Sequence, residues 1–315
     1  MLQRFADYVT FSLLGLQPGS HLAEALNFFI YDTIKIFLLL CTIIYLVAVI
    51  RSSFPPERTK RILSHKREYV GNVLAALLGI VTPFCSCSAV PLFIGFVESG
   101  VPLGVTFSFL VSSPMVNEVA LIMLWGLFGW RVALLYTGTG LVVAIISGIV
   151  IGKLKMERYV QDYVWQMQVG EGETVTMSFR EKLRYAWGYT RDLIKKIFPY
   201  VLVGVGIGGF IHGYAPQDFL LKYAGPHNPF AVPLAVLIGV PLYSNAAGII
   251  PIVHALMEKG LPIGTTLAFM MAVTALSLPE AVILSNVLKR RLLITFFSVV
   301  AVAIVLVGYL FNAVL

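Results

Sequence analysis

An apolar segment with a polar centre covers residues 81–100 and reads Val-Thr-Pro-Phe-Cys-Ser-Cys-Ser-Ala-Val-Pro-Leu-Phe-Ile-Gly-Phe-Val-Glu-Ser-Gly. Both flanks are apolar enough for a position inside a membrane, whereas the centre carries two thiols, two hydroxyls and two prolines. Pro83 and Pro91 each lack a backbone N–H and disfavour a continuous helix, so some peptide groups there have no intrahelical partner. In hydrocarbon, such groups occur only where protein or a water-filled cavity satisfies them. The segment is therefore typical of a broken helix at a transport site.

The composition of the chain indicates a membrane protein. Apolar residues make up 58% of the chain and charged residues only 12%, against roughly 25% charged residues in a typical soluble domain. Several windows hold about 20 apolar residues with few charges, which is the length that crosses roughly 30 Å of hydrocarbon. These patterns predict an all-α polytopic membrane protein.

The net charge of +7 is best explained by membrane topology. Basic residues collect in the cytoplasmic loops of membrane proteins, and here they lie in short segments between the apolar stretches. This distribution argues against nucleic-acid binding. The start of the chain, residues 1–19, lacks the pattern of a signal peptide and favours a short interfacial helix.

The three cysteines, Cys41, Cys85 and Cys87, do not have zinc-finger spacing, and their odd number argues against a disulfide framework. Cys41 lies in an apolar run, where a free cysteine usually acts as a small packing residue. We expect neither a resident metal ion nor a cofactor.

The apolar pattern predicts two kinds of stretch. Four are uninterrupted spans, at about 23–50, 131–152, 193–214 and 291–315. Four others are apolar but interrupted by prolines or polar residues, at 71–98, 102–129, 232–258 and 262–288.

The same order of stretches occurs twice in the chain, at a fixed difference in residue number, so that position 98 corresponds to position 258. We call this difference the repeat offset. Six identities fall within the short segment that begins at Glu98: Glu98/Glu258, Gly100/Gly260, Pro102/Pro262, Gly104/Gly264, Thr106/Thr266 and Phe109/Phe269. This repeat offset predicts a first membrane repeat at 1–152, a cytoplasmic linker at 153–190 and a second membrane repeat at 191–315.

The loop charges predict that the two repeats have opposite orientations. Residues 51–69 hold six Lys and Arg residues, whereas the equivalent loop at 211–229 holds only Lys222. The first loop is therefore expected in the cytoplasm and the second outside. If the repeats are inverted, each must cross the membrane an odd number of times between this loop and its last span. Each of these regions holds two apolar stretches, so one of the two must turn back inside the membrane. The better candidates for such re-entrant segments are 71–98 and 232–258, because prolines interrupt them. Eight full spans with parallel halves are the alternative.

Cys85 and Cys87 are the sharpest candidates for solute binding. Two thiols can converge on one soft ion or metalloid if the backbone is irregular, since on a regular helix they would point about 200° apart. The alternative is that small residues line a close helix crossing. Residues expected to line the same site are Ser86 and Ser88, and from the second repeat Tyr243, Ser244 and Asn245.

Glu118 and Glu280 form a second candidate pair, and they align across the repeat if two residues are inserted in the second copy. A carboxylate deep in an apolar stretch is costly and often binds ions or protons, although it can also stabilise the N-terminus of a half-helix. The polar lining expected beside them is Asn117, Ser112, Ser113, Thr274 and Ser277. The prolines expected to break helices are Pro83, Pro91, Pro114, Pro251 and Pro279.

Four motifs carry a resemblance to a known family. They are Thr-Pro-Phe-Cys-Ser-Cys-Ser at 82–88, Gly-Val-Pro-Leu-Gly at 100–104, Ser-Ser-Pro-Met-Val-Asn-Glu at 112–118 and Pro-Leu-Tyr-Ser-Asn-Ala-Ala-Gly at 241–248. With them the sequence resembles the ArsP-like predicted permease family over most of its length. Members are permeases, and some export trivalent organoarsenicals. The resemblance implies that Cys85 and Cys87 lie near the substrate path, and arsenic is implied only by this resemblance.

Together these observations predict a permease of the cell inner membrane and not an enzyme. It would be a secondary transporter that exports a soft or thiol-reactive solute, such as a trivalent organoarsenical. Its partners would be this small-molecule or metalloid substrate and membrane lipid, with a homo-oligomer left open. Because no nucleotide-binding motif is present, energy would come from an ion gradient or a partner protein. The alternatives are a transmembrane thiol/disulfide electron carrier and a passive channel.

Overall fold

The computed structural model describes residues 2–53, 68–81, 92–97, 100–116, 118–162, 164, 179–214, 228–242, 244 and 246–315. Within these ranges the chain is almost entirely helical, and the β-structure is confined to one isolated bridge between Val160 and Leu288. The prediction of an all-α protein is therefore confirmed.

The helices fall into two series along the chain. The first comprises α1 (Leu2–Asp7), a π-helical turn (Tyr8–Leu13), α2 (His21–Ser53), α4 (Glu68–Val81), α6 (Leu103–Met115), α7 (Glu118–Phe128) and α8 (Trp130–Lys153). After a 3₁₀ turn at Glu157–Tyr159, the second comprises α10 (Phe179–Tyr214), α12 (Ala231–Gly239), α13 (Ala246–Glu258), α14 (Ile263–Ala275), α15 (Leu278–Ser285) and α16 (Arg290–Val314).

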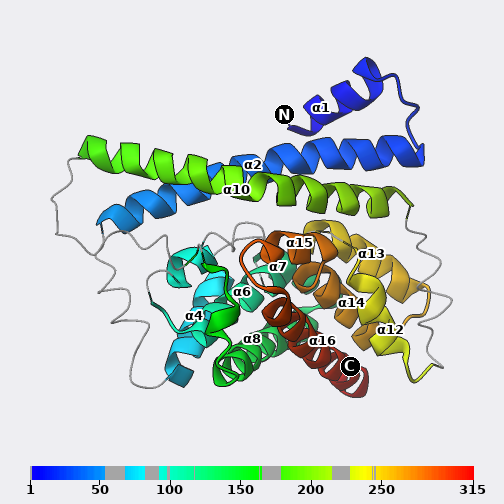
Figure 1. The fold of residues 1–315 in the computed structure, drawn as a ribbon. Coiled ribbons are helices and arrows are strands. Elements are labelled where there is room, and N and C mark those ends of the chain that lie inside the picture. Colours follow the sequence, from blue (N-terminus) through cyan, green and yellow to red (C-terminus); the bar gives the residue numbers. More distant parts are fainter. Residues whose placement is uncertain are drawn as a thin grey trace.

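The two longest described helices, α2 and α10, lie side by side and form a layer between α1 and the bundle that α4, α6–α8 and α12–α16 make (Figure 1). Aromatic rings join them, with centroids 5.1 Å apart for Phe37 and Phe198 and 6.4 Å apart for Tyr45 and Trp187. The helix α10 also contacts α15 in the bundle. It runs without interruption through position 190, where the sequence predicted the end of the linker; the division into two repeats and a linker remains a prediction.

Three helical segments of the described chain are long and apolar enough to cross a membrane. They are α8, the consecutive helices α14 and α15 over Ile263–Ser285, and α16. A fourth arises if α6 and Ala120–Phe128 of α7, which are bent by 46° at their junction, form one broken span. The predicted apolar spans at 131–152 and 291–315 are thus confirmed as helices.

The repeat offset recurs in the helices that form the centre of the bundle. The helices α6, α7 and α8 begin at positions 103, 118 and 130, and α14, α15 and α16 begin at 263, 278 and 290. Gly100 and Gly260 both adopt positive φ, 73° and 93°, a backbone region that glycine enters without steric cost. Pro102 and Pro262 then start α6 and α14 with nearly the same dihedral angles. Equivalent residues therefore build equivalent local structure.

The helices α6 and α14 also cross their partners in the same way. Gly104 lies against the backbone of Gly148 on α8, and Gly264 lies against the backbone of Gly308 on α16. A side chain at Gly104, Gly148 or Gly264 would push the two backbones apart, so the small residues permit the close approach that is typical of membrane helices.

The interruption of the apolar stretch 232–258 lies before Pro251 and not at it. The helix α12 ends at Gly239, and α13, which begins at Ala246, includes position 251. Pro241 cannot donate the backbone hydrogen bond that would continue α12, whereas a proline within a helix removes a single bond of the ladder. Pro114 lies in the last turn of α6 and Pro279 in the first turn of α15.

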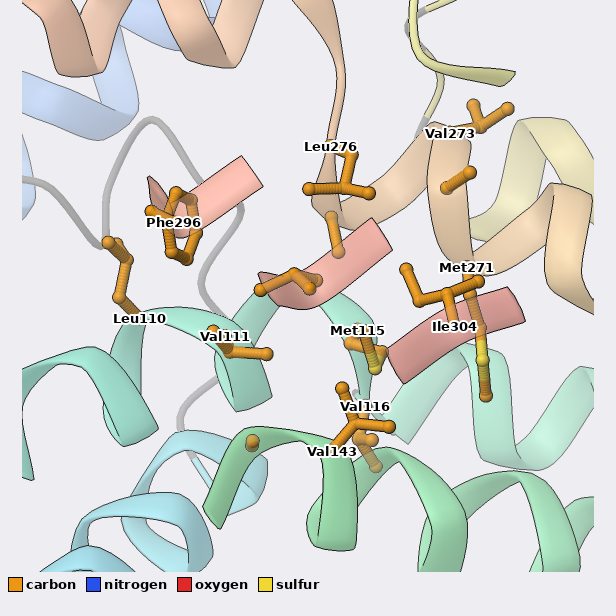
Figure 2. Packing of buried hydrophobic residues seen from close by; sticks show 14 of the residues in the cluster. Leu110, Val111, Met115, Val116, Val143, Met271, Val273, Leu276, Phe296 and Ile304 are labelled. Carbon is orange, nitrogen blue, oxygen red and sulfur yellow. The ribbon is translucent and has the colours of Figure 1, made fainter. Parts of the chain in front are cut away.

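The apolar core lies where the two series of helices meet. Figure 2 shows side chains from α6, α8, α14, α16 and the ends of these helices converging there, among them Leu110, Val111, Met115, Val116, Val143, Met271, Val273, Leu276, Phe296 and Ile304. Every residue of α6 is buried, and so is all of α14 except Ile263. Helices that are apolar all round belong in the interior, so α6 and α14 place any polar group they carry at the centre of the bundle.

Candidate functional site

Both central helices break at the same place. The helix α6 ends at Met115 and α7 begins at Glu118, while α14 ends at Ala275 and α15 begins at Leu278. Each break exposes carbonyl groups of one helix end and N–H groups of the next helix start, which lack intrahelical partners. These two breaks are the candidate functional site, because unpaired backbone groups at a membrane-buried position can bind an ion or a solute.

The break between α14 and α15 carries a buried cluster of polar side chains. Thr274, Ser277 and Glu280 expose 8%, 1% and 2% of their surface. The Ser277 hydroxyl oxygen accepts a bond from the backbone N–H of Glu280 at 3.4 Å and so caps α15. The N–H of Leu278 donates to the carbonyl of Val240 at 2.7 Å, which joins the break to the end of α12. These two bonds fix the backbone at the start of α15 and with it the position of the buried polar side chains.

The break between α6 and α7 is arranged differently. Ser112 and Ser113 are fully buried near the end of α6, and the Ser112 hydroxyl donates to the Phe109 carbonyl at 3.3 Å. Glu118 begins α7 with an exposed side chain. The structure therefore buries only Glu280 of the two candidate carboxylates.

Glu118 and Glu280 do not occupy equivalent positions. Since the starts of α7 and α15 are separated by the same offset as the starts of α8 and α16, no insertion separates the two series across the break. The residue equivalent to Glu118 is Leu278, and Glu280 is the third residue of α15. An insertion of two residues that aligned the carboxylates would also shift the rest of α15, and a deletion of two residues would then be needed before α16. Because α15 and α16 both begin at the same offset, the structure gives no support for this insertion.

Sequence reasoning missed Tyr136 of α8, which lies in a stretch interpreted as an uninterrupted span. Its side chain is fully buried and its hydroxyl lies against Thr274 of α14, without a hydrogen bond of ordinary geometry within the described chain. A buried hydroxyl with no partner is unfavourable by about 1–3 kcal/mol. One signal was available in the sequence, since the residue at the same offset in the second series is Phe296, which lacks the hydroxyl.

Several predicted site residues lie outside the described residues: Cys85, Ser86, Cys87, Ser88, Asn117, Tyr243, Asn245, Pro83 and Pro91. Ser244, between α12 and α13, is half-buried. Of the others, the structure brings into contact the helices α6 and α14, which carry Ser112, Ser113 and Thr274.

A group of ionic and polar contacts holds the junction of α15 and α16. Lys289 pairs with Asp162 through Nζ and Oδ1 at 2.8 Å, and its backbone N–H donates to the Tyr159 carbonyl at 2.7 Å. Arg291 donates to the Tyr159 hydroxyl at 3.2 Å, and this bond lowers the pKa of Tyr159 below its ordinary value. The segment after α8 is therefore fastened to the start of α16.

Comparison with known proteins decides the family. A family model described as a predicted permease matches residues 21–313, which is nearly the whole chain. The chain belongs to the ArsP-like predicted permease family. This permease has no match among solved structures.

Named relatives of the permease come from archaea and bacteria. It is 24% identical to a UPF0718 protein of Methanocaldococcus jannaschii, over 80% of this chain and 84% of that protein. It is 23% identical to the UPF0718 protein YraQ of Escherichia coli, over 84% and 74% of the two chains. It is also 21% identical, over 75% and 78%, to a Streptococcus mutans protein named as a predicted subunit of a two-component membrane permease complex. The family and the apolar helices together identify a membrane permease.

Proposed function

We propose that this permease is a secondary transporter of the cell inner membrane that exports a soft or thiol-reactive solute, such as a trivalent organoarsenical. The observation that carries the proposal is the pair of helix breaks at 115–118 and 275–278, which occupy equivalent positions of the repeat in the most buried helices of the bundle. Paired broken helices that meet near the membrane midplane are a recurrent design of secondary transporters.

The proposal includes opposite orientations of the two repeats. It is supported by the loop charges, because residues 51–69 are strongly basic and 211–229 are not. The short helices support it as well: α4, α12 and α13 have 14, 9 and 13 residues, each fewer than the roughly 20 that cross a bilayer. Re-entrant segments at 71–98 and 232–258 would use such helices and leave an odd number of crossings.

Cys85 and Cys87 are the proposed ligands of the solute. Thiolates prefer soft metals and metalloids, and the two prolines around them, Pro83 and Pro91, allow the irregular backbone that would let both sulfurs face one atom. The remaining polar lining would come from Ser86, Ser88, Tyr243, Ser244 and Asn245.

Proton coupling is assigned to Glu280, with Glu118 as the second candidate. Glu280 is 2% exposed and lies beside Thr274 and Ser277 at the α14–α15 break, and intramembrane carboxyls at such places commonly carry protons or ions. Ser112, Ser113 and Asn117 would supply the polar lining of the other break. A passive channel is the alternative, and it would conduct independently of pH and of Glu280→Gln.

A partner protein is the second energy source consistent with the comparisons. The Streptococcus mutans relative is named as a predicted subunit of a two-component complex. We therefore propose that a partner protein can be needed for transport. If cells that express this chain alone show no transport, transport should be measured again in cells that also express its membrane partner.

The proposal is tested by the accumulation of a trivalent methylarsenical, with inorganic arsenite in parallel, in cells that express the wild type, Cys85→Ser, Cys87→Ser or the double variant. We expect the wild type to lower accumulation and the thiol variants to lose this effect at equal expression. Cys41→Ser is the matched control, because Cys41 is a half-buried free thiol on α2, away from the breaks. If wild type and empty vector accumulate both compounds equally, the arsenical assignment is wrong.

A further inference from the structure

Tyr136 carries a hydroxyl group that packing does not require. The side chain is fully buried in α8, and its hydroxyl makes no hydrogen bond of ordinary geometry to the described residues. At the equivalent position of α16 the chain has Phe296, which is 1% exposed and packs its ring 5.2 Å from that of Phe107. Phenylalanine thus fills this place in the second series without leaving a polar atom buried.

The surroundings of the Tyr136 hydroxyl define what it can bind. Thr274 lies against it, and the Thr274 hydroxyl donates its hydrogen to the Met270 carbonyl at 3.0 Å. The Thr274 oxygen could still accept a hydrogen, but the two hydroxyls make no hydrogen bond of ordinary geometry. A phenol is both donor and acceptor, so within the described chain the Tyr136 donor is unused at the end of α14. Ser277 and Glu280 follow directly at the break, and both are buried.

We propose that Tyr136 is a solute-contacting residue, which donates its phenol hydrogen to an oxygen-bearing solute at the contact between α8 and α14. The inference rests on the proposed function, because it takes the α14–α15 break as part of the solute path. It adds a hydrogen-bond donor to the proposed thiol ligands, so that a soft atom and its hydroxyl or water ligand would be recognised by different side chains.

The alternative is a hydroxyl that stays enclosed in the core. In that case position 136 never meets water, and loss of the oxygen leaves transport unchanged. A residue of the solute path must instead become accessible from one side of the membrane during the transport cycle, whichever solute is carried. Accessibility therefore tests the placement of Tyr136 without knowledge of the substrate.

The first experiment introduces Tyr136→Cys into the full chain with Cys41→Ser, Cys85→Ser and Cys87→Ser, and measures labelling by a membrane-impermeant thiol reagent in right-side-out and inside-out vesicles. Phe296→Cys in the same background is the matched control, because it occupies the equivalent position of the second series. Size-exclusion profiles of the purified variants establish that both remain folded. We expect labelling at position 136 from one side and little at 296.

The result decides between the two placements. No labelling at 136 from either side overturns the inference, because the position is then permanently enclosed. Equal labelling at 136 and 296 also overturns it, because the whole contact between the series then opens and the phenol is not singled out.

The second experiment measures transport by Tyr136→Phe in proteoliposomes with methylarsonous acid, whose arsenic carries hydroxyl groups. Loss of one buried hydrogen bond to the solute predicts an increase of KM by about tenfold with a much smaller change in the maximal rate. An unchanged KM overturns the proposed contact. If the wild type itself does not transport the compound, the proposed substrate is wrong, and labelling at position 136 still decides whether Tyr136 lines the path.

Discussion

The crossings α6–α8 and α14–α16 share one backbone arrangement but close it with different side chains. In the first, Gly152 continues the contact of Gly104 with Gly148. In the second, Asn312 stands at the place of Gly152, accepts a bond from the backbone N–H of Gly264 at 2.8 Å, and donates to the Thr265 hydroxyl at 3.2 Å. The comparison shows that the two crossings share the close approach of the helices, while the polar groups around them differ.

A second difference lies inside the bundle. Ser108 on α6 donates to the Asn72 side chain on α4 at 3.1 Å, and both residues are buried. The residues at the same offset in the second series are Ala268 and Val232, which are apolar and equally buried. Conversely, the second series carries the buried Glu280 where the first has none in the described residues of α6 and α7. The two series of helices thus share their arrangement but bury polar side chains at different positions.

The largest effect is expected from widening the shared crossing. A Cβ at Gly104 would lie 2.5 Å from the Gly148 carbonyl oxygen and 2.9 Å from the Gly152 Cα, so Gly104→Ala must separate the two backbones. Overpacking of this kind destabilises by about 1–3 kcal/mol, sometimes more, and Gly264→Ala should have a similar effect. Thermal unfolding of the purified protein in detergent measures both.

The control for this prediction is Gly138→Ala on α8. A Cβ there would meet nothing within 4 Å, and alanine favours a helix over glycine, so the melting temperature should stay or rise. Equal losses of thermal stability in Gly104→Ala and Gly138→Ala would show that the close crossing of α6 and α8 does not depend on glycine at position 104.

The second prediction concerns the buried pair Asn72 and Ser108. Ser108→Ala removes the donor and leaves the Asn72 side chain without it, which should destabilise the protein by about 1–3 kcal/mol. The double variant Asn72→Val with Ser108→Ala reproduces the pattern of Val232 and Ala268 and should recover most of this loss. Chemical or thermal unfolding of both single variants and the double variant gives the coupling energy. Additive losses would contradict the equivalence of the two sites.

A smaller effect is expected at Asn312. Asn312→Ala removes the side-chain acceptor for Gly264 at the start of α14, and loss of such a cap is unfavourable by about 1 kcal/mol. Asn312→Asp keeps an acceptor and should retain most of the stability. A melting temperature that is lower for the aspartate than for the alanine variant would show that the hydrogen bond to Gly264 is not the stabilising contact.

The smallest predicted effect separates Arg131 from Arg291, which are equivalent in the repeat. Arg291 hydrogen-bonds to Tyr159 and lowers its pKa, whereas Arg131 stacks over Trp130 with its guanidinium carbon 5.7 Å from the ring centre. Arg291→Gln should therefore raise the pKa of Tyr159 toward its ordinary value, and Arg131→Gln should not. Ultraviolet difference titration against Tyr159→Phe measures this.

The sign of the linked stability follows from the lowered pKa. Because folding favours the ionised form of Tyr159, this contribution to stability is present above the ordinary pKa of tyrosine and is lost as the pH falls through the lower value. Arg291→Gln should therefore reduce stability at alkaline pH more than at neutral pH. A loss that is equal at both pH values would argue against the link through Tyr159.

The amino-acid sequence alone was sufficient for the class of protein and for the offset between its two series. The class follows from the excess of apolar residues, which is a local property that each window reports independently. The offset follows from Gly100/Gly260 and Pro102/Pro262, since glycine at positive φ and proline at a helix start restrict the backbone directly. These features need no knowledge of neighbouring helices.

Burial of individual polar groups was decided only by the tertiary structure. Glu118 and Glu280 look alike in the sequence, but one is exposed and the other is 2% exposed. Tyr136 lies in an apolar span that shows no break, and it becomes a candidate only because α14 brings Thr274 against it. The physical reason is that a helix has several faces, and which of them meets another helix depends on packing between segments distant in the chain.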